Sequence, residues 1–526
     1  MKGLEAVRSF SAPPLQPLGR TGTEGIRYTI AVFLLIVSTV ALNLMANGNP
    51  IAALAPTVGF GVLWLMWVTP VRKTVLVLIF LGLTLESPNE VPAGGQWHSP
   101  LYFLGAMLLA KWNDVFGVGA MVFTGVDLLC CYLIIALVWR RATGSKMDTE
   151  GQEQTATVMA LGVFITLAGT LWIWGYGLAR GGTFRFSLLQ VYRLVYVPFL
   201  FFLCHAALRG PKDHASIAKV IVGAAVVRGL LAFYIRKTVV PIIPGEPLAY
   251  ATTHGDSMLF SGGAAFIIAL INEGVGRKRR GLTVLLVLCL GAVLLGAMAN
   301  KRRLVWVELS ATLVTFYLMS TWTPLKRALS RGVIVLAPIL LLYFVIGWNA
   351  GGGLFAPVQT ARSIIDSKSD GSTAWRDLEN MNLIMNILRN PILGSGFGIE
   401  YDEVIKLPDI SGFKEYRLIT HNSVLGFLAF AGLFGFSLLW CIVAVGVFLA
   451  ARSYRRAKEP IDRAIALWII ATLIAYINSV YGDMGQSSWT AVFTVAPALA
   501  VCGKLAVATG AWPARKRKAT LESKTA

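Results

Sequence analysis

Long apolar runs recur along the chain from about residue 27 to residue 508, and short polar segments separate most of them. A helix needs about 20 apolar residues to cross roughly 30 Å of hydrocarbon. Only helices and closed barrels satisfy their backbone hydrogen bonds in lipid, and these runs are too long for barrel strands. The pattern therefore predicts an all-α fold, a polytopic integral membrane helical bundle of about 12 to 14 transmembrane helices.

The same pattern divides the chain into segments. We expect an N-terminal cytoplasmic segment at 1–26, a transmembrane bundle at 27–348, an external loop at 349–418, C-terminal transmembrane helices at 419–508 and a cytoplasmic tail at 509–526. The apolar run at 101–110 is short enough for a re-entrant or surface helix. The individual spans are predicted at about 27–47, 51–69, 72–86, 118–139, 156–175, 189–208, 216–235, 254–272, 281–299, 303–321, 331–348, 419–451, 463–481 and 486–508.

Composition agrees with a membrane protein, since 56% of the 526 residues are hydrophobic and only 14% are charged. No cleavable signal peptide is evident, so we expect the first run to remain as a transmembrane helix. All six cysteines fall inside predicted spans without the spacing of metal ligands, and we interpret them as packing residues.

The distribution of lysine and arginine predicts the orientation. Short basic loops stay in the cytoplasm, and most basic clusters of this chain, whose net charge is +20, fall on alternate loops. This interpretation puts both termini inside and the 349–418 loop outside the membrane. The net positive charge is then explained by the membrane topology and by attraction to anionic membrane lipids. No nucleic-acid-binding module is recognisable. The cytoplasmic clusters are Arg72 and Lys73, Arg140 and Arg141, Arg209 and Lys212, and those within 276–281, 324–331, 451–458 and 514–518.

Several basic residues lie on the outer side, against this rule. The most conspicuous group is the run Lys301, Arg302 and Arg303, which opens the predicted span at 303–321. Such residues can be ordinary interfacial side chains that reach toward water. A cluster of guanidinium groups at the outer surface is equally suited to a phosphate or pyrophosphate, which arginine grips with paired hydrogen bonds. The other members of the set are Arg180, Arg185, Arg193, Arg236 and Lys237.

The external loop contains a second region of interest, "STAWRDLENMNLIMNILRNPILGSGFG", from Ser372 to Gly398. Apolar residues at helical spacing predict an amphipathic helix that begins after Ser372 and ends near Arg389. The apolar set is Trp375, Leu378, Met381 and Met385. The glycines that follow, Gly394, Gly396 and Gly398, either reverse the chain or let its backbone approach a ligand closely.

The stretch "HNSVLGFLAFAGLFG", from His421 to Gly435, supplies the most specific pattern. Together with "KRR", "STAWR" and "NPILGSGFG", it resembles the O-antigen ligase and polymerase superfamily of bacterial membrane glycosyltransferases. The ligase pattern is His, then Asn, Ser or Gln, nine residues, Gly, two residues, and Gly, Thr or Tyr. His421, Asn422, Gly432 and Gly435 fit it, and the resemblance covers roughly residues 254–450.

This resemblance implies transfer of a glycan from an undecaprenyl-pyrophosphate carrier to a hydroxyl acceptor on the outer face of the membrane. It also implies location in a bacterial inner membrane, with the active site facing the periplasm. It implies that His421 deprotonates the acceptor and that Arg302 or Arg303, with Arg376, holds the pyrophosphate. Lys301, Arg193 and Asn422 complete the set of expected substrate-binding residues. No metal site is recognisable, and neither a metal nor another cofactor is expected.

The acceptor stays open at this point. A lipid A core would make the protein a ligase of lipopolysaccharide assembly, and a second carrier-linked glycan would make it a surface-polysaccharide polymerase.

Two other interpretations concern residues inside the spans. Ala429, Gly432 and Gly435 follow at intervals of three, a stripe expected to let a neighbouring helix approach. Asp127, Arg228 and Glu308 are ionisable residues within predicted spans, and such residues often line transport paths. They support an alternative function as a lipid-linked oligosaccharide flippase, unless they form structural pairs.

Overall fold

The computed structural model consists of helices joined by loops. In the part of the chain that it describes there is no β-strand, and an isolated bridge joins Lys111 to Thr124. This confirms the predicted all-α fold. The described residues are 22–45, 50–85, 100–116, 123–145, 148, 151–242, 251–277, 279–350, 352–355, 358–359, 361–362, 371–407, 415–483 and 488–514.

The chain forms two compact units. The first comprises residues up to Val68 together with Trp112–Val122. It contains α1 (Gly22–Met45), α2 (Pro50–Val68) and the short α5 (Trp112–Phe116), and α1 packs against α2. These helices expose large apolar side chains, as expected of helices that face lipid.

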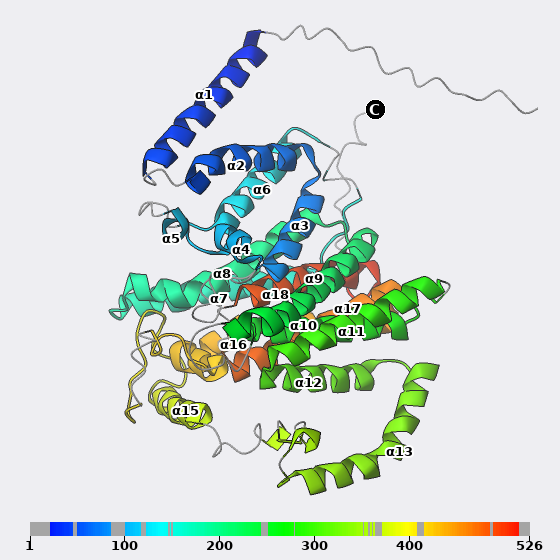
Figure 1. Cartoon of the computed structure of the whole chain (residues 1–526). Coiled ribbons are helices and arrows are strands. Elements are labelled where there is room, and N and C mark those ends of the chain that lie inside the picture. Colours follow the sequence, from blue (N-terminus) through cyan, green and yellow to red (C-terminus); the bar gives the residue numbers. More distant parts are fainter. Residues whose placement is uncertain are drawn as a thin grey trace, which may run out of the picture. The chain divides into compact units, whose positions relative to one another are not determined.

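The second unit holds all the other helices. Its most buried helices are α10, α17 and α18, and α10 packs against both α12 and α17. α16 lies against α7 and α17, while α18 lies against α8 (Figure 1). The helices of this unit are α3 (Val71–Thr84), α4 (Tyr102–Leu109), α6 (Gly125–Ala142), α7 (Thr157–Ala179), α8 (Phe184–Ala207), α9 (His214–Tyr234), α10 (His254–Asn272), α11 (Arg280–Asn300), α12 (Arg303–Met319), α13 (Pro324–Gly347), α15 (Gly371–Arg389), α16 (Ser423–Arg456), α17 (Pro460–Gly482) and α18 (Trp489–Ala508).

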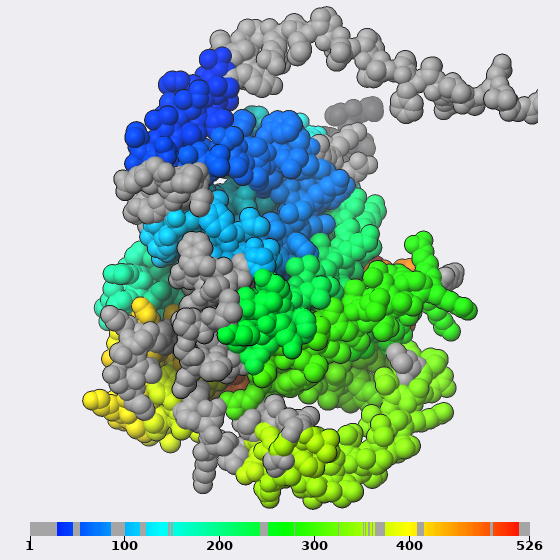
Figure 2. All heavy atoms as spheres, viewed as in Figure 1, coloured from blue at the N-terminus to red at the C-terminus, as the bar shows by residue number. Residues whose placement is uncertain are grey.

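Nine helices of the described residues are long and apolar enough to cross a membrane. Shorter apolar helices at Thr29–Met45 and Ala53–Val68 fall within the first two predicted spans. No residue in the most apolar stretch of α13 is buried. Its side chains, yellow-green in Figure 2, are exposed on the visible face. Lipid tails solvate such a surface as well as protein does. The protein is therefore a multi-pass membrane protein.

The basic loops predicted to be cytoplasmic meet at one end of the second unit. Arg141 donates to the carbonyl of Ala206 (3.4 Å), and Arg463 pairs with Glu273 (2.9 Å). Lys504, near the end of α18, donates to the carbonyl of Leu208. α17 begins at this end and α10 finishes there. Their other ends carry Asp483 and His254, which lie beside Arg376 and Arg302. The two kinds of basic residue are thus separated by the length of the bundle.

Two of the three ionisable residues inside predicted spans form structural pairs. Arg228 contacts both carboxylate oxygens of Asp256, at 2.7 and 2.9 Å. Asp127 caps the start of α6 and accepts hydrogen bonds from Tyr192. Glu308 is fully buried, and its carboxyl lies 3.4 Å from the hydroxyl of Ser261. Arg228 and Asp127 therefore lend the flippase interpretation no support. The six cysteines are free thiols.

Candidate functional site

A break in α16 shapes the region around the predicted site. At Gly432 the backbone has φ 60° and ψ −177°, so the helix is interrupted nine residues after Ser423. The loop after α15 forms four backbone hydrogen bonds with α16 on either side of this break. Ser395 and Gly396 donate to the carbonyls of residues 429 and 430, and residues 433 and 434 donate to those of 391 and 392, at 2.7–3.0 Å.

This geometry corrects the expected role of Gly432. We predicted that it forms a helix-packing stripe with Ala429 and Gly435, but a Cβ at this position would lie 2.3 Å from the carbonyl oxygen of Ile392. Glycine is needed because the chain takes a left-handed conformation against another backbone. Gly435 is the one that packs closely, against Ile173.

The glycines after α15 also allow positive φ angles and close approach to another backbone. Gly394, Gly396 and Gly398 all have positive φ, at 68°, 91° and 92°. A Cβ on Gly396 would lie 2.2 Å from the Cα of Gly177 in α7, and Arg180 donates to the carbonyl of Gly394 (3.1 Å). The glycines therefore reverse the chain and pack its backbone closely against α7 and α16.

His421 stands immediately before α16, and a buried carboxylate lies beside it. Its backbone N–H donates to Glu379 (3.2 Å), and its Nδ1 lies 3.3 Å from Glu379 Oε2. The Glu379 side chain is fully buried, whereas that of His421 is 20% exposed. Trp375 packs edge-to-face on the imidazole with 4.7 Å between ring centroids. Asn422 accepts a hydrogen bond from the N–H of Leu425 (3.2 Å) and so caps α16.

The predicted amphipathic helix exists as α15, and its buried face includes polar residues. Met381 and Met385 are exposed, at 44% and 39%, while Glu379, Asn382 and Leu383 are buried. The inward face needs polar groups, because Asn382 bonds both the N–H and the carbonyl of Ile405. An exposed apolar stripe of this kind suits the membrane interface.

Arg302 is held at the turn between α11 and α12. Lys301 takes a left-handed conformation there (φ 55°), which ends α11 one residue before Arg302. Arg302 Nη1 lies 2.6 Å from Nε2 of His254, and two other guanidinium nitrogens face the carbonyl of Thr252 at 3.4–3.5 Å. Of the two arginines left open by the sequence, Arg302 is thus the one joined to His254, and Arg303 begins α12.

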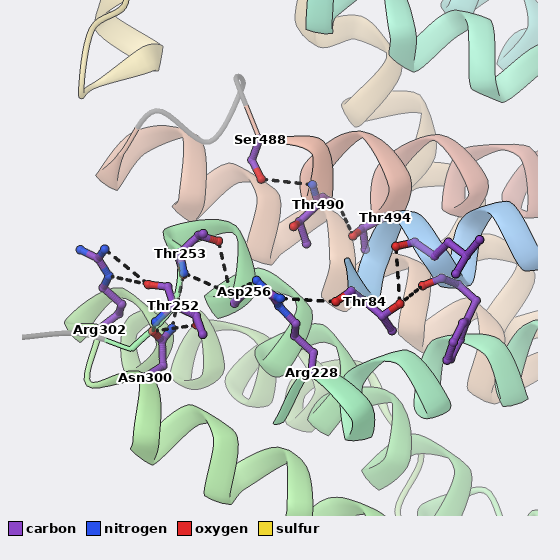
Figure 3. A network of polar contacts seen from close by, with 12 residues as sticks. Thr84, Arg228, Thr252, Thr253, Asp256, Asn300, Arg302, Ser488, Thr490 and Thr494 are labelled. Carbon is purple, nitrogen blue, oxygen red and sulfur yellow. Dashed lines mark hydrogen bonds and ion pairs between the residues drawn. The ribbon is translucent and has the colours of Figure 1, made fainter. Parts of the chain in front are cut away.

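Behind Arg302 a buried polar network fixes the start of α10. Asn300 accepts hydrogen bonds from the N–H and hydroxyl of Thr252, and Asp256 accepts one from the N–H of Thr253. Figure 3 shows this network continuing from Asp256 to Arg228, which also faces the carbonyl of Thr84. The position of Arg302 therefore depends on residues from α3, α9, α10 and α11.

Arg376 approaches the same place from α15. It donates to the carbonyl of Gly482 (3.1 Å), and its Nη2 lies 3.8 Å from Asp483 Oδ1. Asp483 Oδ2 in turn lies 3.0 Å from Nδ1 of His254. The structure thus connects Arg302, His254, Asp483 and Arg376 in a chain.

Three side chains at the site were missed by sequence reasoning: His254, Glu379 and Asp483. Each lies within or at the end of a predicted helix, where no local motif distinguishes it. The sequence signal that could have identified them is the scarcity of these residue types, because the chain has only five histidines and 27 acidic residues. Of the predicted residues, Arg193 lies in another cluster, with its guanidinium 4.0 Å from the ring of Trp489 and 5.5 Å from that of Tyr192.

The electrostatics of the site favour an anion. The N-termini of α10, α12 and α16 begin at His254, Arg303 and Ser423, so the positive ends of three helix dipoles adjoin the site residues. Burial, reinforced by the charge of Glu379, raises the pKa of Tyr401, whose phenol therefore stays neutral near that carboxylate. Among the described residues, no three His, Cys, Asp or Glu side chains gather to hold a metal ion.

Comparison with known proteins adds one positive finding. Residues 284–440 match a family model described as O-antigen ligase, which confirms the resemblance predicted from the sequence. The matched segment includes Arg302, Arg376 and His421, but neither His254 nor Asp483. No curated protein matches the chain significantly.

Proposed function

We propose that this multi-pass membrane protein, which carries an O-antigen ligase domain at residues 284–440, transfers a glycan from undecaprenyl pyrophosphate to a hydroxyl acceptor. An enzyme of the O-antigen ligase or polymerase type follows from the domain in general. The lipid-linked donor, the periplasmic location of the site and the roles of its residues are our proposal.

The proposed reaction begins with His421. Its Nδ1 faces the carboxylate of Glu379, so Nε2 is the nitrogen that takes the proton of the acceptor hydroxyl. The acceptor oxygen then forms a bond to the anomeric carbon of the donor sugar, and the bond from that carbon to the pyrophosphate oxygen breaks. Glu379 stabilises the imidazolium that results and holds the ring in place, with Trp375 packed on its edge.

The electron pair of the broken bond departs with the carrier pyrophosphate. Arg302 and Arg376 are proposed to take up this negative charge, since guanidinium groups match phosphate oxygens with two parallel hydrogen bonds. Asn422 supports the site through the structure of α16, which its side chain caps. Lys301 contributes the turn before Arg302, and its charge is exposed at the edge of the site.

One observation carries the proposal. Arg302 and Arg376, 74 positions apart in the sequence, are connected through His254 and Asp483, and Arg376 and Glu379 lie one helical turn apart on α15 beside His421. A candidate base and two candidate anion-binding groups thus adjoin one another at the same end of the bundle.

The test is reconstitution of the purified full-length chain in nanodiscs with carrier-linked glycan and acceptor. His421→Ala should reduce transfer by about 10² to 10⁴, while binding of the carrier persists through the arginines. Arg389→Ala is the matched control, since Arg389 forms an exposed ion pair with Asp402 on the same helix as Arg376 and should leave transfer unchanged. Wild-type transfer by His421→Ala would refute the assignment of the base.

The same assay distinguishes the two acceptors. Parallel reactions with a lipid A core and with a second carrier-linked glycan should give product with one of them, which decides between ligase and polymerase. If the wild-type protein moves the carrier across a bilayer and forms no glycosidic bond with either acceptor, the transferase function is wrong.

A further inference from the structure

Asp483 occupies an unexpected position for an acidic residue. It follows the last residue of α17, and its side chain is only 9% exposed. One carboxylate oxygen lies 3.0 Å from His254 Nδ1 and the other lies 3.8 Å from Arg376 Nη2. A negative charge thus stands where the proposed function requires a negatively charged substrate to bind.

The imidazole of His254 lies between this carboxylate and Arg302 and contacts both. Arginine can only donate, so the 2.6 Å contact from Arg302 Nη1 requires Nε2 of His254 to be the acceptor. The ring proton is then on Nδ1, which faces Asp483. One carboxylate therefore lies close to both arginines, 3.8 Å from Arg376 and joined to Arg302 through the imidazole.

The charges of the four side chains nearest the imidazoles of His254 and His421 cancel in this arrangement. Arg302 and Arg376 carry two positive charges, and Asp483 and Glu379 carry two negative ones. Glu379 is fully buried and turned toward His421, whereas Asp483 faces the arginines themselves. A pyrophosphate that binds to Arg376 must approach Asp483 and compete with it for the same guanidinium.

We propose that Asp483 is an internal counter-ion that, with His254, positions Arg302 and Arg376 in the absence of substrate and lowers their affinity for pyrophosphate. The carboxylate keeps the arginines in place before the donor arrives, and its repulsion helps the spent carrier pyrophosphate to leave. Asp483 and His254 are positioning residues in this scheme. The inference rests on the proposed function, and both residues lie outside the segment matched by the family model.

Binding of inorganic pyrophosphate to the full chain in detergent, measured by calorimetry, tests the proposal without any transfer reaction. Asp483→Asn keeps the size of the side chain and removes its charge, so we expect binding to tighten by about tenfold. His254→Ala should weaken binding, because Arg302 loses the contact that orients it. These opposite signs separate a counter-ion from a residue needed only for folding, which would weaken binding in both variants.

Steady-state kinetics supply a second measurement. In Asp483→Asn the donor KM and kcat should fall together, since the product carrier is released more slowly, and Asp483→Glu should restore both toward wild type. Asp402→Asn is the matched control, because this exposed carboxylate lies in the same external segment as Arg376 and should change neither value.

The outcomes are distinguishable. Pyrophosphate binding that is unchanged or weaker in Asp483→Asn overturns the counter-ion role, even if transfer depends on His421 as proposed. Binding that is identical in wild type and Arg376→Ala contradicts the proposed function itself, and the counter-ion role with it.

Discussion

Replacing Gly432 with alanine should damage the site from a position that touches no substrate. The residue has φ 60° and ψ −177°, a conformation that costs any residue with a Cβ about 1 to 3 kcal/mol. The new Cβ would also lie 2.3 Å from the carbonyl oxygen of Ile392, a backbone atom that cannot move aside by changing rotamer. Overpacking of this kind typically costs a further 1 to 3 kcal/mol or so.

The two costs together predict a loss of about 2 to 6 kcal/mol in the stability of this region. The chain can avoid them only by giving up the hydrogen bonds that join the loop after α15 to the broken α16. Since His421 precedes α16 and Glu379 belongs to α15, the separation of these two side chains should increase. Transfer should therefore fall even in the protein that remains folded.

Thermal unfolding of the purified protein in detergent measures the first effect, and the transfer rate at a temperature well below unfolding measures the second. Gly291→Ala is the matched control, because no atom lies within 4 Å of its added Cβ and Gly291 is within the regular helix α11. That control should be neutral or slightly stabilising. The reasoning is refuted if Gly432→Ala and Gly291→Ala unfold at the same temperature and transfer glycan equally well.

Three further predictions concern the site and the topology. Arg376→Lys should reduce transfer strongly, because lysine keeps the charge and loses the planar fork, while Arg389→Lys should have no effect; equal rates in the two variants would exclude a bidentate role. Glu379→Gln should lower kcat at least about tenfold with little change in donor KM, since a buried carboxylate 3.3 Å from Nδ1 stabilises the imidazolium; an unchanged kcat would remove Glu379 from the mechanism. In a cysteine-free background, Lys406→Cys should react with an impermeant maleimide in intact cells and Lys458→Cys only after permeabilisation; the reverse would invert the topology.

Much of the fold could be predicted because lipid leaves few alternatives for an apolar run. The helices α7, α10 and α17 fall where hydropathy put them, since each spans the hydrocarbon by length alone. The break in α16 could not be predicted in this way. Gly432 lies in an apolar run that reads as one continuous helix, and its left-handed conformation depends on a loop more than thirty residues earlier in the chain.

Individual residues of the candidate site could be predicted, but the contacts between them could not. His421, Arg302 and Arg376 were found because they fit the motifs of the resembled superfamily, and Arg302 also because it lies in a basic cluster on the side where few are expected. The amphipathic helix α15 was predicted, but not which of its faces is buried, because helical periodicity identifies an apolar stripe without showing whether it meets protein or lipid. The buried Glu379 on the other side of that helix looked like an ordinary polar residue of an external loop.

Asp483 and His254 show why a local motif is insufficient here. Both lie outside residues 284–440, yet Asp483 lies 3.8 Å from the guanidinium of Arg376, and His254 lies between that carboxylate and Arg302. Arginines alone would repel each other in a site without substrate, and each has a long flexible side chain that would have to be ordered on binding. A carboxylate at the end of α17 and an imidazole at the start of α10 keep the arginines ordered before the donor binds, and the carboxylate then competes with the pyrophosphate. The affinity for the donor therefore depends on helices that flank the matched segment as well as on the segment itself.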